Sequence, residues 1–217
     1  MSNIKCYCLT IKGSEREKAM IKHLSSIYGL KYEIIYGKKY TEDMIDYVPI
    51  RKNQKYWNLS EFSKHENYYR NACSCANGHK DMMKKFLNDD VEWGLICEDD
   101  IRLYPTIMND LEMIVNKYNG GGSIYHLSTE SYLLYSHQID KISNEIKLKI
   151  GKIGNSAACY LVNKKFAKEY IKTNTPIKFP ADIAIWKILN YNIPVIYGLP
   201  ITFSDFQKKS IIGDKTL

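Results

Sequence analysis

Three adjacent carboxylates, Glu98, Asp99 and Asp100, directly follow a short apolar run over residues 91–97. The run is rich in β-favouring residues, which predicts a buried strand of an α/β sheet rather than a helix. Ligands of open α/β sheets collect outside the carboxyl ends of the strands, so the three acids stand where a binding site is expected. Keeping them ionised beside a low-dielectric sheet edge requires open water or a cation.

The acids favour a hard divalent cation. Side chains of an extended segment alternate between two faces, so Glu98 and Asp100 are expected to point one way and Asp99 the other. Such an all-oxygen clamp suits Mg²⁺ or Mn²⁺, with further ligands from water and from the phosphates of a substrate. The alternative is a solvated acidic turn that binds nothing. The apolar strand before the acids favours the metal site.

The elements that position these acids begin with a β-α-β unit. Residues 4–11 predict a strand, and Ser14 and Glu17 have the spacing of a capping box before a helix. A second strand is predicted over residues 31–36. This unit is the opening of a Rossmann-like sheet. Arg16 is either a surface residue of the first helical turn or a phosphate contact beside the loop after the first strand.

The rest of the chain continues as alternating helices and strands. We expect a polar loop over residues 38–59 and a helical region over residues 61–87 that breaks near residues 77–78. His79, just after this break, is either a helix-start residue packed on the sheet or a contact to a donor phosphate or sugar. The patterns also predict helices over residues 105–118, 164–172 and from Pro180 onward, and strands over residues 123–128, 159–162, 194–197 and 201–203. Residues 131–138 fit a short strand or a loop.

Length and composition describe one globular domain. The chain has 217 residues, of which 45% are hydrophobic and 25% charged. No run approaches the roughly 18 apolar residues of a membrane helix, and no signal peptide is recognisable, so we expect a cytoplasmic protein. The net charge of +7 comes mainly from lysines scattered along the chain. This scatter argues against nucleic-acid binding and favours attraction for anionic substrates such as nucleotide phosphates.

The six cysteines include two Cys-x-Cys pairs, at residues 6–8 and 73–75. These pairs lack the spacing of zinc ribbons and knuckles, and no secretory signal points to disulfides. We therefore expect buried, reduced and chemically inert thiols.

Five blocks of the chain occur in the order of one known family. They are the strand and helix start around Thr10 and Arg16, the Ser-Cys-Ala-Asn-Gly-His block at residues 74–79, the strand that ends in Glu98-Asp99-Asp100, residues 157–162, and Pro-Ala-Asp at residues 180–182. Together they resemble glycosyltransferase family 25, which contains lipopolysaccharide-type glycosyltransferases and collagen galactosyltransferases. Ser74 and Gly78 depart from the Gly-Cys-x-x-Ser-His pattern of that family.

The resemblance implies a GT-A fold, an α/β domain with a mixed, mostly parallel sheet flanked by helices. It implies a single glycosyltransferase domain over residues 1–217. Within it, residues 1–105 are expected to form a nucleotide-sugar-binding half, residues 106–205 an acceptor-binding half, and residues 206–217 a tail.

The resemblance also implies an inverting glycosyltransferase that uses a divalent metal. The expected reaction moves a hexose from a nucleotide sugar, a UDP-sugar in our expectation, to a hydroxyl of a glycan or glycoconjugate. Asp100 and Glu98 are the expected ligands of Mn²⁺ or Mg²⁺. The residues expected to contact the donor are Thr10, Arg16, His79, Glu98 and Asp99.

Inversion needs a carboxylate that removes the proton from the acceptor hydroxyl. Asp182 is the candidate base and Asp205 the runner-up. Asp182 could equally be an acid that the helix dipole favours in a first helical turn. Two other classes of protein stay open. One is a metal-dependent phosphoryl-transfer or nuclease domain, which often needs two metals and more acids. The other is a catalytically silent nucleotide-sugar-binding module.

Overall fold

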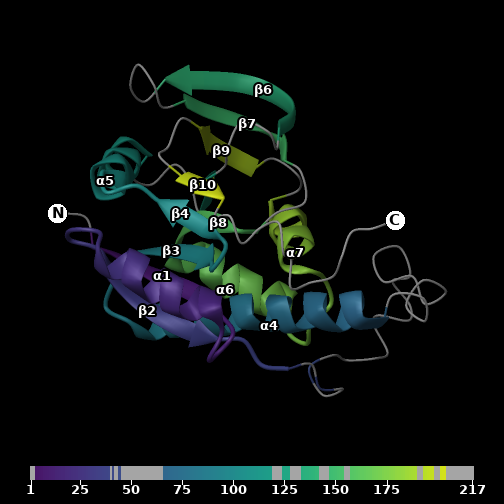
Figure 1. Ribbon diagram of the computed structural model, residues 1–217. Coiled ribbons are helices and arrows are strands. Elements are labelled where there is room, and N and C mark those ends of the chain that lie inside the picture. The colour runs from purple at the N-terminus through teal and green to yellow at the C-terminus, as the bar shows by residue number, and fades with distance from the viewer. Residues whose placement is uncertain are drawn as a thin grey trace.

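A computed structural model describes residues 3–39, 41, 44, 66–118, 124–127, 133–141, 147–153, 157–189, 193–197 and 201–203. Helices and strands alternate along these residues (Figure 1). The strands are β1 (Ile4–Thr10), β2 (Lys31–Tyr36), β3 (Trp93–Glu98), β4 (Ile101–Leu103), β5 (Ile124–Leu127), β6 (Leu133–Lys141), β7 (Lys147–Ile153), β8 (Cys159–Asn163), β9 (Ile193–Tyr197) and β10 (Ile201–Phe203). The helices are α1 (Glu15–Ser25), α4 (Glu66–Asn88), α5 (Ile107–Tyr118), α6 (Lys164–Thr173) and α7 (Ala181–Ile188).

In the described part of the chain, the strands form an eight-stranded sheet in the order β2-β1-β3-β8-β5-β9-β7-β6, and β4 pairs with β10 in a two-stranded sheet. Strand β1 is parallel to β2 and β3, and β5 is parallel to β9. Strand β8 is antiparallel to β3 and β5, and β7 is antiparallel to β9 and β6. All strands of the large sheet except β8 and β7 therefore run in one direction. The predicted mixed, mostly parallel sheet flanked by helices is confirmed.

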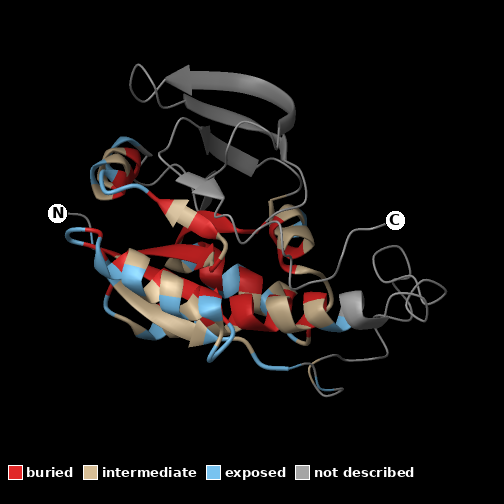
Figure 2. Ribbon diagram, viewed as in Figure 1, coloured by how far each residue is buried: buried red, intermediate tan, exposed pale blue. Residues whose placement is uncertain are grey.

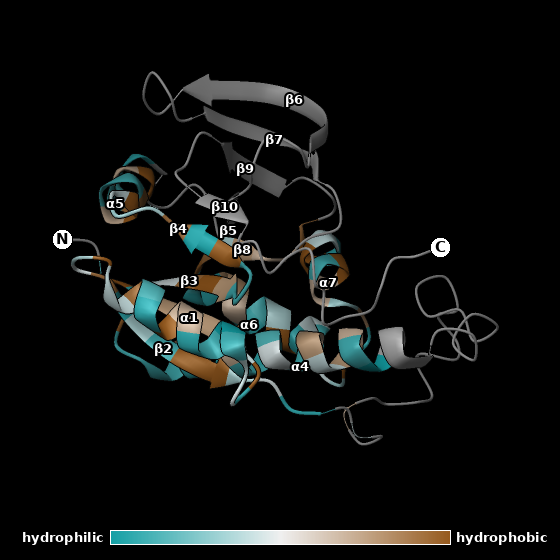
Figure 3. Ribbon diagram, viewed as in Figure 1, coloured by the Kyte–Doolittle hydropathy of each residue, from teal (hydrophilic) through white to brown (hydrophobic). Residues whose placement is uncertain are grey.

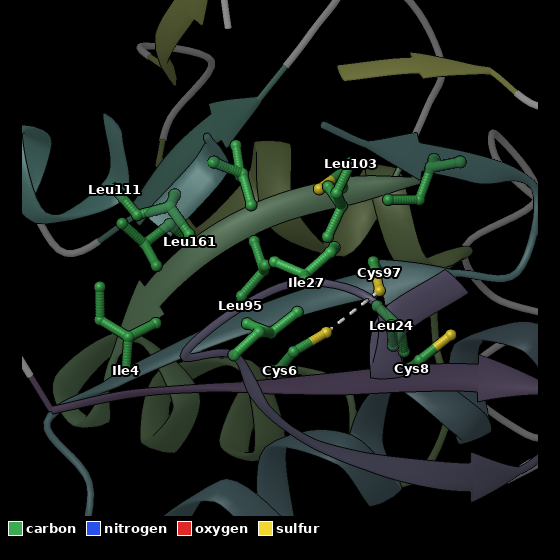
Figure 4. Packing of buried hydrophobic residues seen from close by; sticks show 14 of the residues in the cluster. Ile4, Cys6, Cys8, Leu24, Ile27, Leu95, Cys97, Leu103, Leu111 and Leu161 are labelled. Atoms are coloured by element: carbon green, nitrogen blue, oxygen red, sulfur yellow. Dashed lines mark hydrogen bonds between the residues drawn. The ribbon is translucent and has the colours of Figure 1, made fainter. Parts of the chain in front are cut away.

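Helices α1 and α5 cover one face of the sheet. Buried side chains of β1, β3 and β8 pack there against Leu24 of α1 and Leu111 of α5. Figure 4 shows this packing, in which the Sγ atoms of Cys6 and Cys97 lie 3.5 Å apart. All six cysteines of the chain are free thiols. Figure 3 shows hydrophobic and hydrophilic residues on different sides of α5, as expected for a helix that covers a sheet.

Helices α4, α6 and α7 cover the opposite face. Tyr7 of β1 packs there with Phe86 of α4, Phe166 of α6 and Ile185 of α7. Residues of β1 alternate between the two cores, because successive side chains of a strand point to opposite faces. With both faces covered, β3 is almost entirely buried (Figure 2). The apolar run before the three acids is thus the interior strand that its composition predicts.

Ser14 caps α1, as the capping-box spacing predicts. The Ser14 Oγ accepts a hydrogen bond of 3.0 Å from the backbone N–H of Glu17. The Glu17 carboxylate accepts a hydrogen bond from the backbone N–H of Gly13, one residue before the usual partner in such a box. The cap fixes the start of α1 directly after β1. It thereby places Arg16, in the first turn, beside the carboxyl end of the sheet.

Helix α4 runs through Asn77 and Gly78 without interruption, so the predicted break is wrong. A Cβ atom added to Gly78 would lie 2.5 Å from Cδ1 of Leu9 in β1. The close approach of α4 to β1 therefore accounts for the glycine and outweighs its low helix propensity. His79 consequently lies inside a helix, and the expectation of a helix-start histidine is wrong as well.

Other differences concern short strands. Strands β4 and β7 were not expected from the sequence pattern, and the ambiguous region near residues 131–138 contributes to β6. Residues 40, 42, 43 and 45–59 of the predicted loop lie outside the described residues. Where helices are described, none combines the length and the apolar character that crossing a membrane would require.

Candidate active site

Glu98, Asp99 and Asp100 lie at the carboxyl end of β3. Glu98 is the last residue of this strand, and Asp99 and Asp100 form a turn into β4. Strand β1 is parallel to β3 and pairs Leu9 with Glu98, so the end of β1 lies beside the acids. The backbone is not extended beyond Glu98. The expected alternation of the three side chains, which assumed an extended backbone, therefore does not apply at Asp99 and Asp100.

Asp99 is held from two sides. Its Oδ2 accepts a hydrogen bond of 2.6 Å from the Thr10 hydroxyl at the end of β1. Its Oδ1 lies 3.3 Å from a guanidinium nitrogen of Arg16 in α1. Burial raises the pKa of Asp99, although Thr10 and Arg16 oppose the shift. Arg16 is buried, so the expectation of a surface arginine is wrong, and the structure brings three expected site residues into one cluster.

Glu98, at the end of β3, contacts a second group of side chains, which lie on α4. Its Oε1 lies 3.1 Å from His79 Nε2 and 3.7 Å from Cys75 Sγ. The other ring nitrogen of His79, Nδ1, lies 2.6 Å from the hydroxyl of Tyr160 in β8. Burial opposes ionisation of Glu98, but the hydrogen bond and charge of His79 outweigh it and hold the pKa of Glu98 below its usual value. His79 is fully buried, so it reaches the site through Glu98.

Asp100 has a polar atom without a partner. Its Oδ1 is buried and makes no hydrogen bond to any described residue. Burial, together with the negative charges of Glu98 and Asp99, raises the pKa of Asp100 to about 7. A buried carboxylate oxygen without a donor is costly, unless a cation satisfies it. The carboxylate oxygen of Asp100 is therefore a suitable ligand for a hard divalent ion.

Asp182 lies in the first turn of α7. Its Oδ1 accepts a hydrogen bond of 2.8 Å from the backbone N–H of Ile183, the next residue, and no side chain caps the start of this helix. Burial raises the pKa of Asp182, and the charge of Glu98 raises it further. Asp182 therefore lies in a first helical turn, where the helix dipole favours an acid, and near enough to Glu98 to sense its charge. Asp205, the runner-up base, lies outside the described residues.

Two neighbours of the acids were not expected from the sequence. Cys75 and Tyr160 complete the surroundings of His79 and Glu98. The sequence could have indicated that Cys75 lies beside His79, because residues four apart lie on one face of a helix. No local pattern links Tyr160 to His79, from which it is separated by 81 residues.

The sheet and the acid cluster define the class of protein. Both agree with the GT-A-like fold that the sequence resemblance implies, with the acids at the carboxyl ends of the strands. A model of glycosyltransferase family 25 (LPS biosynthesis protein) matches residues 3–185, and the chain belongs to this family. The protein is thus a glycosyltransferase-family enzyme, and the alternative of a phosphoryl-transfer or nuclease domain is set aside.

A solved structure shares the fold at low sequence identity, and others resemble the chain more weakly. A197 from STIV has a TM-score of 0.50 and 12% identity, over 94% of this chain and 85% of that chain. A Bacillus anthracis protein described as a glucose-1-phosphate thymidylyltransferase has a TM-score of 0.47 and 12% identity, over 95% of this chain and 92% of its own. A Desulfovibrio desulfuricans protein described as a nucleotide-diphospho-sugar transferase has a TM-score of 0.42 and 9% identity, over 91% and 80%. A search of curated proteins finds no match.

Proposed function

We propose that the protein is a metal-dependent, inverting hexosyltransferase. Its donor is a nucleotide sugar, with UDP as the nucleotide, and its acceptor is a hydroxyl of a glycan or glycoconjugate. Membership of family 25 supports the transferase class. The observation that carries the metal dependence is the buried Oδ1 of Asp100, which has no partner among the described residues.

Asp100 and Glu98 would hold the divalent cation, Mn²⁺ or Mg²⁺. The Oε1 of Glu98 is engaged by His79 and Cys75, which leaves Oε2 as the oxygen for this ion. When bound, such an ion supplies Lewis-acid stabilisation of the charge that develops on a leaving diphosphate. The pKa of about 7 at Asp100 supports this assignment, because nearby negative charge and burial make the site favourable for a cation.

Thr10, Arg16 and Asp99 would form the nucleotide side of the site. Thr10 and Arg16 lock the Asp99 carboxylate at the end of β1, where α1 also begins. A helix start is favourable for phosphate, and a fixed carboxylate suits the hydroxyls of a ribose. His79 would act indirectly, by holding Glu98 in place. Residues 1–105 would thus bind the nucleotide sugar, and residues 106–205 would bind the acceptor.

Asp182 would act as the general base for the acceptor hydroxyl. A base works best when its pKa lies near the working pH, and burial moves the pKa of Asp182 in that direction. The hydrogen bond from Ile183 N–H fixes one carboxylate oxygen, so the other can receive the proton. The proton leaves the acceptor hydroxyl as its oxygen attacks the anomeric carbon opposite the departing diphosphate.

Donor hydrolysis tests this function without knowledge of the acceptor. A panel of nucleotide sugars is incubated with the protein, with Mn²⁺, with Mg²⁺ or with a chelator, and released nucleoside diphosphate is measured. We expect release of UDP from one donor, only when a divalent ion is present. Equal release with the chelator would contradict metal dependence. Metal-dependent donor binding without release or transfer to any acceptor of a glycan panel would indicate a silent binding module.

A further inference from the structure

Helix α4 meets the end of β3 at a cluster of potential metal ligands. Cys75 Sγ, His79 Nε2 and a carboxylate oxygen of Glu98 all lie within 4.8 Å of one another. Within the described residues this is the one group of three or more potential ligands that are so close together. We propose that it binds a second divalent cation of borderline softness, with Zn²⁺ as the best match, on the opposite carboxylate oxygen of Glu98 from the ion proposed for the sugar donor.

The spacing of the three atoms suits a single small ion. Zinc–ligand bonds of about 2.0–2.3 Å in a tetrahedral site place neighbouring ligand atoms roughly 3.2–3.8 Å apart. Glu98 Oε1 lies 3.1 Å from His79 Nε2 and 3.7 Å from Cys75 Sγ. Two of the three separations therefore match a zinc site, and the third, between the Cys75 sulfur and a ring nitrogen of His79, is no longer than 4.8 Å. Three protein ligands leave a fourth position for water.

The surroundings of the triad support this assignment. The Tyr160 hydroxyl, 2.6 Å from His79 Nδ1, fixes the orientation of the ring, as outer partners of histidine ligands commonly do. The Glu98 side chain is 22% exposed whereas His79 is fully buried, so an ion would enter from the Glu98 side. A sulfur ligand disfavours Mg²⁺ and Mn²⁺ and favours Zn²⁺. The two proposed ions therefore differ in chemistry and share only the Glu98 side chain, of which the Zn²⁺ would take Oε1.

A divalent ion at these three atoms would stabilise the Cys75 thiolate and offset the negative charge of the adjacent Glu98 carboxylate. Cys75 would then be an exception to the inert thiols expected from the cysteine spacing. The ion would also fix the side chain of Glu98, at the end of β3, against α4.

Cobalt substitution tests the site directly, with no sugar donor present. The full-length protein is stripped with a chelator and titrated with Co²⁺, and the thiolate-to-cobalt charge-transfer band is followed in the near ultraviolet. We expect one equivalent of Co²⁺ to produce the band, and Zn²⁺ to abolish it by displacement. The Cys75→Ser variant should lose the band. Cys73→Ser, a buried cysteine of the same helix outside the triad, should keep it, and so should Asp100→Ala.

Circular dichroism confirms that each variant is folded before titration. Absence of the band in the unmodified protein would overturn the proposal, and so would its persistence in folded Cys75→Ser. Loss of the band in folded Cys73→Ser would also overturn it, because the sulfur ligand would then be a different cysteine. The band is measured without donor or acceptor, so its failure and a failure of the proposed transferase reaction are separate results.

Discussion

The Thr10 hydroxyl donates a 2.6 Å hydrogen bond to the Asp99 carboxylate, although the two residues are separated by 89 positions in the sequence. Both residues are buried. This bond joins the end of β1 to the turn after β3, and Arg16 holds the other oxygen of the same carboxylate. Two of the three adjacent acids are therefore held by different elements: Asp99 by β1 and α1, and Glu98 by α4.

Replacing Thr10 by valine should lower the free energy of unfolding by about 1–3 kcal/mol, because a buried acceptor loses its donor while the branched shape is kept. Urea denaturation at neutral pH measures the change. Thr175→Val is the matched control, because Thr175 is exposed and does not precede a helix, and its effect should stay within about 0.5 kcal/mol. Equal stability of Thr10→Val and the parent would show that the Thr10–Asp99 bond has no net effect.

Asp89 makes a second, partly buried polar contact with β1, which predicts a pH dependence of stability. Its Oδ2 lies 2.6 Å from Lys5 Nζ and accepts a 2.8 Å hydrogen bond from Tyr7. Burial opposes ionisation, but these two partners outweigh it and lower the pKa of Asp89. A lowered folded-state pKa contributes stability above the unfolded value of about 3.9, and this contribution is lost as the pH falls through the folded-state pKa.

Asp89→Asn should therefore be less stable than the parent by about 1–3 kcal/mol at pH 7. The difference should shrink as the pH is lowered below about 4, where the parent also loses the charge. Chemical denaturation at a series of pH values measures it. The adjacent, exposed Asp90 provides the control Asp90→Asn. A stability difference that does not change with pH would contradict an ionic role for Asp89.

The contact between Gly78 and Leu9 predicts that Gly78→Ala changes stability in opposite directions in two backgrounds. Gly78→Ala should destabilise the parent by about 1 kcal/mol, because overpacking costs about 1–3 kcal/mol and exceeds the gain in helix propensity of about 1 kcal/mol. In a Leu9→Ala background the added methyl group has room, so the same change should stabilise the protein. A double-mutant cycle by urea denaturation measures the coupling. Additive effects would show that α4 does not pack on Leu9 as closely as 2.5 Å implies.

The local features of the fold could be predicted from the sequence. The apolar run before Glu98 has the composition of an interior strand, and the Ser14 cap depends on residues three apart. The β1-α1-β2 unit follows from such short-range patterns. Continuity of α4 could not be predicted, because Gly78 is disfavoured in helices and its reason lies in the packing on Leu9. Strand β4 spans only residues 101–103, too few for a pattern to be recognised.

The sequence predicts most residues of the candidate site, but it does not predict which of them contact one another. Thr10, Arg16, Glu98 and Asp99 were expected near the donor, and the structure brings them together in two clusters at one sheet edge. Glu98 and Asp99 belong to different clusters because the chain turns after Glu98. A pattern that assumes an extended strand does not predict this turn. The contact of His79 with Tyr160 also depends on how α4 and β8 meet.

Asp182→Asn separates a general base from a helix-start acid. The asparagine side chain keeps an oxygen that can accept the hydrogen bond from Ile183, but it cannot take a proton. If Asp182 is the base, donor and metal binding should be unchanged, and transfer should slow by about two to four orders of magnitude. Transfer rates with the identified donor and acceptor measure the effect. A near-parental rate, together with a large loss in Asp205→Asn, would move the role to Asp205.

The most direct measurement is isothermal titration calorimetry of donor binding to the parent and to Asp100→Ala, with and without Mn²⁺. The account predicts that Mn²⁺ strengthens donor binding to the parent. Asp100→Ala should lose at least about 100-fold in that affinity, because a direct ligand contributes more than the outer partners, whose loss costs about 10–100-fold. The melting temperature should hold or rise, because the change removes a buried oxygen without a partner and the repulsion from Glu98 and Asp99.

Glu92→Ala, an exposed acid before β3, is the control and should bind like the parent. If folded Asp100→Ala binds donor and Mn²⁺ as tightly as the parent, the carboxylates after β3 do not hold the metal and the central claim is wrong.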